Sequence, residues 1–235
     1  MQKEREPKMK QLNMQLVVFF QPKTNLRRFT NEIEDALGEN YFPPQTIPIP
    51  DEIPPEAPRI ILTPKNQLSQ IAISNNSISF SKGYLDADHE TPKNIDTEIE
   101  LLSKILSIIK VDKFNYCGII KNFLEETDKP QKQIQKKLLS ESLQHINLES
   151  NITIQITQVL DTYYINKQIQ ACYEQTKAIQ NQKTGIIYTI DVNNKKSANT
   201  TEADIGSIKA KLKQIESIIS SNVNDDIAEC FTLHQ

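Results

Sequence analysis

The alternation of apolar and polar residues predicts a run of strands and helices along the first half of the chain. Strands are expected over 13–21, 59–63, 70–74 and 77–82, with helices over 26–37 and 95–109. The apolar run 16–20 predicts that the first strand is buried on both faces. Gly38 is the expected stop of the first helix, and Asn75-Asn76 is the expected hairpin turn, because Asn tolerates positive φ.

The second half repeats this order. Strands are predicted over 114–125, 152–160, 163–173 and 185–192, with a helix opening at Pro130 and a last helix bearing apolar residues from Ile205 to Ile227. Thr200 or Thr201 is its expected cap. Gly118, in the middle of a strand, indicates a bulge or a close approach of another backbone.

Both halves therefore follow the order strand, helix, three strands, helix. The predicted fold class is α+β, with two pseudo-repeated β-α-β-β-β-α halves whose antiparallel sheets are each covered on one face by a long helix. Helix-grip and TATA-binding-protein-like folds share this order, which is an analogy of fold and carries no function. The expected divisions are a disordered tail over 1–12, a first half over 13–110 and a second half over 111–235.

Eight of the twelve prolines lie between positions 43 and 64. This density excludes helix and predicts an extended, polyproline-like crossover strapped over the surface. A ligand for a proline-recognising groove is the functional alternative, which we favour less because the Ile residues of the segment are suited to packing.

Composition narrows the classes of function. A net charge of −3, from 27 basic and 30 acidic residues, gives the whole chain no field that attracts nucleic acid. Cys117, Cys172 and Cys230 lie in apolar patterns and are expected to be buried thiols of a reducing, cytoplasmic protein. Five glycines are too few for a phosphate cradle. The apolar run 16–20 is too short to span a membrane, so we expect no membrane contact.

Candidate chemistry is sparse. Asp86, Asp88 and His89 could hold a divalent metal, but their segment lacks a calcium-loop pattern and a solvated loop explains it better. We therefore predict no metal, no cofactor and no catalytic residue.

Two sets of residues are candidates for binding. A protein partner could contact tyrosines on an exposed sheet face, namely Tyr163, Tyr164, Tyr173 and Tyr188. Nucleic acid could contact a basic stripe made of Arg27, Arg28, Lys132, Lys136, Lys137, Lys209 and Lys213. The alternative for the basic residues is the solvated face of helices, which is their more common role.

Three stretches resemble a sporadically distributed family of uncharacterised bacterial α+β proteins. They are the segment 58–86, the strand KFNYCGIIKNF and the closing IESIISSNVNDDIAECFT. This sequence departs from the family pattern in the central strand, where an Arg and aromatic run is expected and the residues are Ile120, Lys121, Asn122 and Phe123. The resemblance implies a fold and, from the family's patchy occurrence, an association with defence systems.

The sequence is therefore interpreted as a non-enzymatic binding or assembly protein. Its partner would be another protein or a second copy of the chain, within a bacterial antiviral defence or toxin-related system. A nucleic-acid-binding accessory factor is the first alternative and a metal-dependent hydrolase the second.

Overall fold

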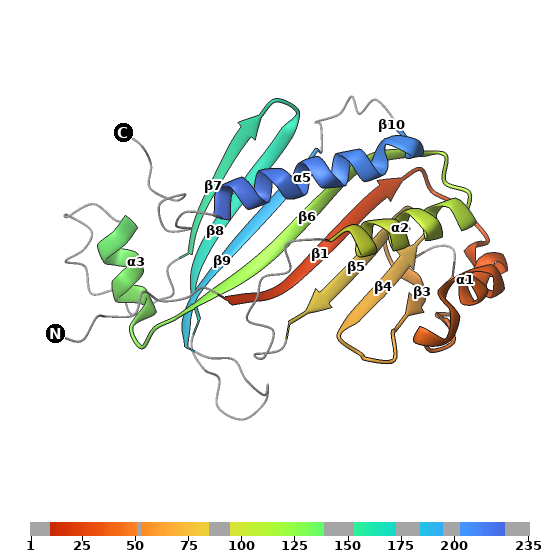
Figure 1. Cartoon of the computed structure of the whole chain (residues 1–235), viewed down its shortest axis with the longest axis horizontal. Coiled ribbons are helices and arrows are strands. Elements are labelled where there is room, and N and C mark those ends of the chain that lie inside the picture. The colour runs from red at the N-terminus through yellow and green to blue at the C-terminus, as the bar shows by residue number, and fades with distance from the viewer. Residues whose placement is uncertain are drawn as a thin grey trace.

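The computed structural model describes residues 10–50, 53–84, 95–138, 153–172, 184–194 and 203–223. These residues form a mixed α+β structure, which confirms the predicted class at that level. They contain one ten-stranded sheet and four α-helices (Figure 1). None of the helices in these ranges combines the length and the apolar character that crossing a membrane would require.

The strands and helices lie close to their predicted positions. The strands are β1 (Lys10–Phe20), β2 (Gln45–Thr46), β3 (Pro58–Leu62), β4 (Ser69–Ser74), β5 (Ser77–Gly83), β6 (Lys113–Glu126), β7 (Thr153–Leu160), β8 (Tyr163–Cys172), β9 (Gly185–Asn193) and β10 (Ala203–Asp204). The helices are α1 (Thr30–Leu37), α2 (Asp96–Ile108), α3 (Pro130–Leu138) and α5 (Ile208–Val223), with 3-10 turns η1 (Leu26–Phe29), η2 (Gly38–Asn40) and η3 (Ile205–Ser207). The first strand extends into the predicted tail, because Lys10 and Gln11 pair with Leu124 and Phe123 of β6.

The strands follow the order β2-β3-β4-β5-β1-β6-β9-β8-β7, and β10 pairs with the start of β6. The pairings described are antiparallel. The two longest strands, β1 and β6, lie in the middle and pair over nearly their whole length, with Leu16 opposite Ile119. One continuous sheet therefore contains strands from both halves of the chain.

The core lies on one face of this sheet. Side chains alternate along a strand, so Met14, Leu16, Val18 and Phe20 of β1 share a face, and each is at most 1% exposed. Val17 and Phe19 on the other face are only partly buried, so the prediction that β1 is buried on both faces is wrong. The reason is that the helices cover one face alone among the described residues.

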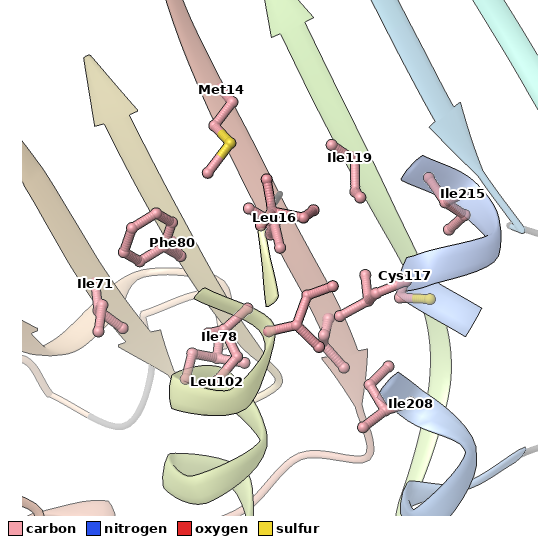
Figure 2. Close-up of a cluster of buried hydrophobic side chains, with 14 of the residues drawn as sticks. Met14, Leu16, Ile71, Ile78, Phe80, Leu102, Cys117, Ile119, Ile208 and Ile215 are labelled. Atoms are coloured by element: carbon pink, nitrogen blue, oxygen red, sulfur yellow. The ribbon is translucent and has the colours of Figure 1, made fainter. Parts of the chain in front are cut away.

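Helices α2 and α5 lie across the buried face (Figure 1). Their apolar residues at helical spacing point to the sheet, namely Ile99, Leu102, Ile105 and Leu106 from α2 and Ile208, Leu212, Ile215 and Ile219 from α5. Figure 2 shows Leu102 of α2 beside Ile78 of β5, and Ile208 and Ile215 of α5 on the side of Cys117 and Ile119 of β6. The two helices also contact each other, so they close the core.

Two local predictions need correction. Asn75 and Asn76 connect β4 to β5 as predicted, but neither has a positive φ; their carbonyls instead accept hydrogen bonds from the backbone of Lys23 and Phe20. The last helix is preceded by η3, whose cap is Asp204, through a hydrogen bond that its side chain accepts from Gly206 N. The predicted caps Thr200 and Thr201 lie outside the described residues.

The proline-rich segment forms an edge of the sheet. β2 pairs with β3, and the ladder extends through Phe42 N to Thr63 O and Ile47 N to Arg59 O. The first part of the segment is therefore an extended edge strand that runs beside β3. Proline lacks a backbone donor and is tolerated at an edge strand, which is where Pro43, Pro44 and Pro48 lie.

Strand β9 lies close to Gly118 of β6, and this close approach supplies a test of the central packing. A Cβ at Gly118 would lie 2.9 Å from Asn193 Cβ and 3.2 Å from Val192 O, whereas one at Gly83 would meet only Leu68 O at 3.9 Å. We expect Gly118→Ala to lower the free energy of unfolding by ~1–3 kcal/mol, because β9 must move. Urea denaturation measures it, with Gly83→Ala as the matched control. Equal stability of the two variants would show that β9 yields at no cost.

Candidate interaction surfaces

Three lysines lie in one transverse row on the helix-covered face of the sheet. Lys82 of β5 and Lys121 of β6 flank Met14 of β1 on either side. Lys167 of β8 follows Lys121 in the row, across Ile190 of β9. Since adjacent strands are ~4.8 Å apart, successive lysines are separated by roughly 10 Å. Lys121 and Lys167 are 3% and 2% exposed, so the row passes through the interior.

Glutamates of the covering helices neutralise two of these lysines. Lys82 Nζ lies 2.9 Å from Glu98 Oε1 of α2, and Lys121 Nζ lies 2.5 Å from Glu216 Oε1 of α5. A buried charge is costly unless it is paired. Each ion pair therefore favours one position of its helix on the sheet. The alternation of the strand pattern does not reveal this row, because a lysine is expected to face solvent.

A cluster of buried polar atoms lies beside these ion pairs. The Tyr84 hydroxyl, both polar atoms of the Gln11 side chain and Glu216 Oε2 are buried without a hydrogen bond. Burial, followed by the negative charges of Glu98 and Glu216, raises the pKa of Tyr84 far above its usual value. The neighbouring Gln11 amide opposes that rise, although the two groups do not meet in hydrogen-bond geometry. Such groups are commonly satisfied by ordered water.

Tyr163 and Tyr188 are buried on the helix-covered face, so the prediction that they lie on an exposed face is wrong. Each is 2% exposed. The Tyr163 hydroxyl donates to Gln214 Oε1 at 2.7 Å, and the Tyr188 hydroxyl donates to Glu125 Oε2 at 2.6 Å. These bonds satisfy the polar end of each ring. The signal was present in the sequence, since Tyr163 shares its strand parity with the buried Ile165 and Ile169 and Tyr188 with Ile186 and Ile190.

The other two predicted tyrosines are placed differently. Tyr164 has the opposite parity and is partly buried on the open face of the sheet. Tyr173 lies outside the described residues. On the same open face, the rings of Phe19 and Tyr116 stack on each other, with centroids 4.3 Å apart. Each of these two rings therefore has one face covered by the other ring.

Neutral polar side chains occupy much of the open face. Asn122 donates to Asn13 Oδ1 and accepts from Thr189 Oγ1, both at 2.6 Å, which links β1, β6 and β9. Asn166 makes a second chain, since it accepts from Thr157 and donates to Asp191. These groups satisfy one another. The face is therefore a hydrogen-bonded, nearly uncharged surface, which lacks the cationic character of a nucleic-acid platform.

The predicted basic residues do not come from one surface element. Arg27 and Arg28 are exposed on η1, Lys132 and Lys136 are exposed on α3, and Lys209 and Lys213 are exposed on α5. Lys213 pairs with Asp96 Oδ1 at 2.7 Å. The side chain of Lys137 lies outside the described residues. Arg27 and Arg28 line one pocket together.

The metal candidates Asp86, Asp88 and His89 lie outside the described residues. Within the described ranges, no group of three or more His, Cys, Asp and Glu side chains is close enough to hold a metal ion. The described part of the chain thus offers no alternative centre for the hydrolase hypothesis.

The cysteines within the described ranges are unpaired thiols. Cys117 is fully buried in the core, and burial raises its pKa to about 12. Cys172 is partly buried, and burial raises its pKa as well. The prediction of a buried thiol is confirmed for Cys117, while Cys230 lies outside the described residues.

The two edges of the sheet differ sharply in how they are protected. At one edge, β2 is two residues long and prolines flank it on both sides. At the other edge, β7 has eight residues, TIQITQVL, with no charge and no proline. Val159 and Leu160, at its end, are 65% and 48% exposed. Natural sheets normally shorten, charge or cover an edge strand, because its unpaired backbone groups can pair with another chain.

The buried ion pair Lys121–Glu216 supplies a test of the covered face. Glu216→Leu leaves Lys121 buried without a partner, so we expect the free energy of unfolding to fall by ~3–5 kcal/mol. The double variant Lys121→Met/Glu216→Leu is expected to recover most of that loss. Urea denaturation measures both. The exposed pair is the control, since Lys213→Ala should change stability by less than ~1 kcal/mol; an equal loss there would contradict the assigned role of burial.

The raised pKa of Cys117 predicts its reactivity. Only the thiolate reacts with disulfide reagents, and a pKa of about 12 leaves on the order of 10⁻⁴ of this thiol ionised at pH 8. Peptide mass mapping after brief treatment with a thiol reagent should find Cys172 labelled well before Cys117. Labelling of Cys117 should become rapid in urea. Rapid labelling of Cys117 in the native protein would contradict its placement in the core.

Comparisons with known proteins add no functional assignment. The chain matches no protein-family model, and the search of curated proteins finds no relative. The surface feature that best distinguishes this chain is the difference between the two edges of its sheet.

Proposed function

We propose that this chain is a binding protein, without catalysis of its own, that accepts a strand of a protein partner along β7. The observation that carries the proposal is the edge of β7, which is uncharged, free of proline and without an outer neighbour among the described strands, set against the short, proline-flanked edge at β2. In strand addition, the main chain of the edge supplies hydrogen bonds and the alternate side chains supply specificity. The other binding hypotheses have weaker support, because the open face is nearly uncharged and the basic residues are dispersed.

The side chains of β7 suit such a contact. An uncharged strand does not repel an approaching strand of either sign, and Val159 and Leu160 add exposed apolar area at its end. The strand is also held in place. It pairs with β8 from Thr153 opposite Gln170 to Leu160 opposite Tyr163, and β8 is anchored by the buried Tyr163. A rigid edge loses little conformational entropy when a partner binds.

We also infer that the two halves are structural repeats of the β-α-β-β-β-α type, as in helix-grip folds. The sheet order supports this, because β5, β4 and β3 succeed β1 outward as β9, β8 and β7 succeed β6. In this correspondence β7 takes the place of β3. β3 has β2 as its outer neighbour, whereas β7 has none among the described strands. The partner strand would occupy the position equivalent to β2.

Site-specific cross-linking tests the proposal. A photoreactive residue at the exposed position Gln155 of β7 should cross-link in host cells to a segment of a partner protein or to β7 of a second copy. Val159→Lys/Leu160→Lys should reduce the cross-linked product at least ~10-fold, equivalent to ~1.4 kcal/mol of binding free energy, because charged edge strands resist pairing. The urea midpoint should stay unchanged, since both side chains are exposed.

Phe42→Lys/Ile53→Lys is the matched control, because it adds the same charge at exposed apolar residues near the other edge. This variant should cross-link like the wild type. An intramolecular cross-link from Gln155 to residues 139–152, or a monomer that forms no intermolecular product, would refute the proposal.

A further inference from the structure

An arginine-rich pocket lies at the opposite end of the sheet from β7. Its volume is about 530 Å³, and it is lined by Asn25, Leu26, Arg27, Arg28, Ile49, Pro50, Arg59 and Asn75. Its lining comes from η1, from β3, from the proline-rich segment before β3 and from the β4–β5 turn. Three arginine residues thus line one cavity.

Arg59 is the unusual member of this group. It is 5% exposed, although arginine is rarely buried unless it is paired with an acid. Its two terminal nitrogens donate to the carbonyls of Pro50 and Ile53, at 3.4 and 3.2 Å, and its Nε is buried without a partner. No carboxylate among the described residues forms an ion pair with it. Carbonyl groups orient the guanidinium but do not neutralise its charge.

Arg27 and Arg28 lie at the exposed side of the pocket. Arg27 donates to Ile47 O at 3.0 Å, and the Arg28 guanidinium lies 4.6 Å from the centre of the Phe29 ring. Neither contact involves an acid. Both contacts orient long side chains that would otherwise be free in solvent, so part of the entropy lost on ligand binding is already lost in the folded protein.

We propose that this pocket binds a phosphate or phosphomonoester dianion. Guanidinium groups bind the oxygens of such anions in pairs of parallel hydrogen bonds. A guanidinium has five N–H donors, of which Arg59 uses two, so the buried group retains donors for a ligand. A dianion offers negative charge to three arginines that form no ion pair with a described residue, and the amides of Asn25 and Asn75 add further donors. The apolar wall of Leu26, Ile49 and Pro50 accommodates the organic part of a phosphomonoester.

Titration with two probes tests this site in the full-length chain. Inorganic phosphate and AMP are added at constant ionic strength, and binding is followed by calorimetry and by chemical-shift changes of the arginine side chains. We expect saturable binding of at least one probe. Stronger binding of AMP would identify a phosphomonoester as the ligand, and equal binding would identify the phosphate group as sufficient.

Variants at the exposed side of the pocket locate the binding. Arg27→Gln/Arg28→Gln should weaken binding at least 10-fold, while Lys136→Gln/Lys209→Gln, which removes the same charge from exposed residues of α3 and α5, should leave it unchanged. Arg59→Lys keeps the charge but not the fork of donors and should also weaken binding, provided that it folds. If Arg59→Lys does not fold, the Arg27→Gln/Arg28→Gln variant alone decides whether the pocket binds the anion.

Three outcomes would overturn the proposal: no saturable binding of either probe, equal loss in both double variants, or wild-type affinity in Arg27→Gln/Arg28→Gln. This site and the β7 edge can fail separately, because the pocket variants leave β7 intact and Val159→Lys/Leu160→Lys leaves the arginines intact.

Discussion

The antiparallel pairing of β1 with β6 is the constraint on which the rest of the structure depends. These strands come from different halves of the chain, yet they form the middle of the sheet and pair from residues 10 to 20 of β1. A shift of one residue in this register would exchange the two faces of either strand. It would expose Leu16 or Ile119, and it would separate the central strands from both covering helices.

Ion pairs on the covered face of the sheet fix where each helix lies on it. Apolar contact between a helix and a sheet is tolerant of small shifts, whereas a buried lysine is stable only near its acid. Lys82 meets Glu98 of α2 and Lys121 meets Glu216 of α5. The two pairs lie in the same transverse row, on either side of Met14. One row of the sheet therefore positions both helices, and the buried hydroxyl of Tyr84 lies in the field of both glutamates.

The two ends of the sheet differ in their surface chemistry. The proline-rich segment closes one end and, together with η1, forms a pocket with Arg59 at its interior. The other end presents the uncharged strand β7. A closed edge with cationic donors suits a small anion, while an edge strand without an outer neighbour among the described residues suits another strand. We therefore assign the two proposed binding roles to opposite ends of one rigid sheet.

The sequence by itself determined the order, type and approximate ends of the longer described strands and helices, because periodicities of 2 and 3.6 are local properties. The two-residue strands β2 and β10 are too short to show such a period. The burial of Tyr163 could also be predicted, because Tyr163 alternates along β8 in step with Ile165 and Ile169. Tertiary structure decided the rest. Lys121 faces the core because Glu216 of α5, remote in sequence, pairs with its charge, and the proline-rich segment forms an edge because β3 offers it backbone partners. The arginine pocket and the open edge of β7 likewise depend on which strands lie side by side, and strand order is set by contacts between distant residues.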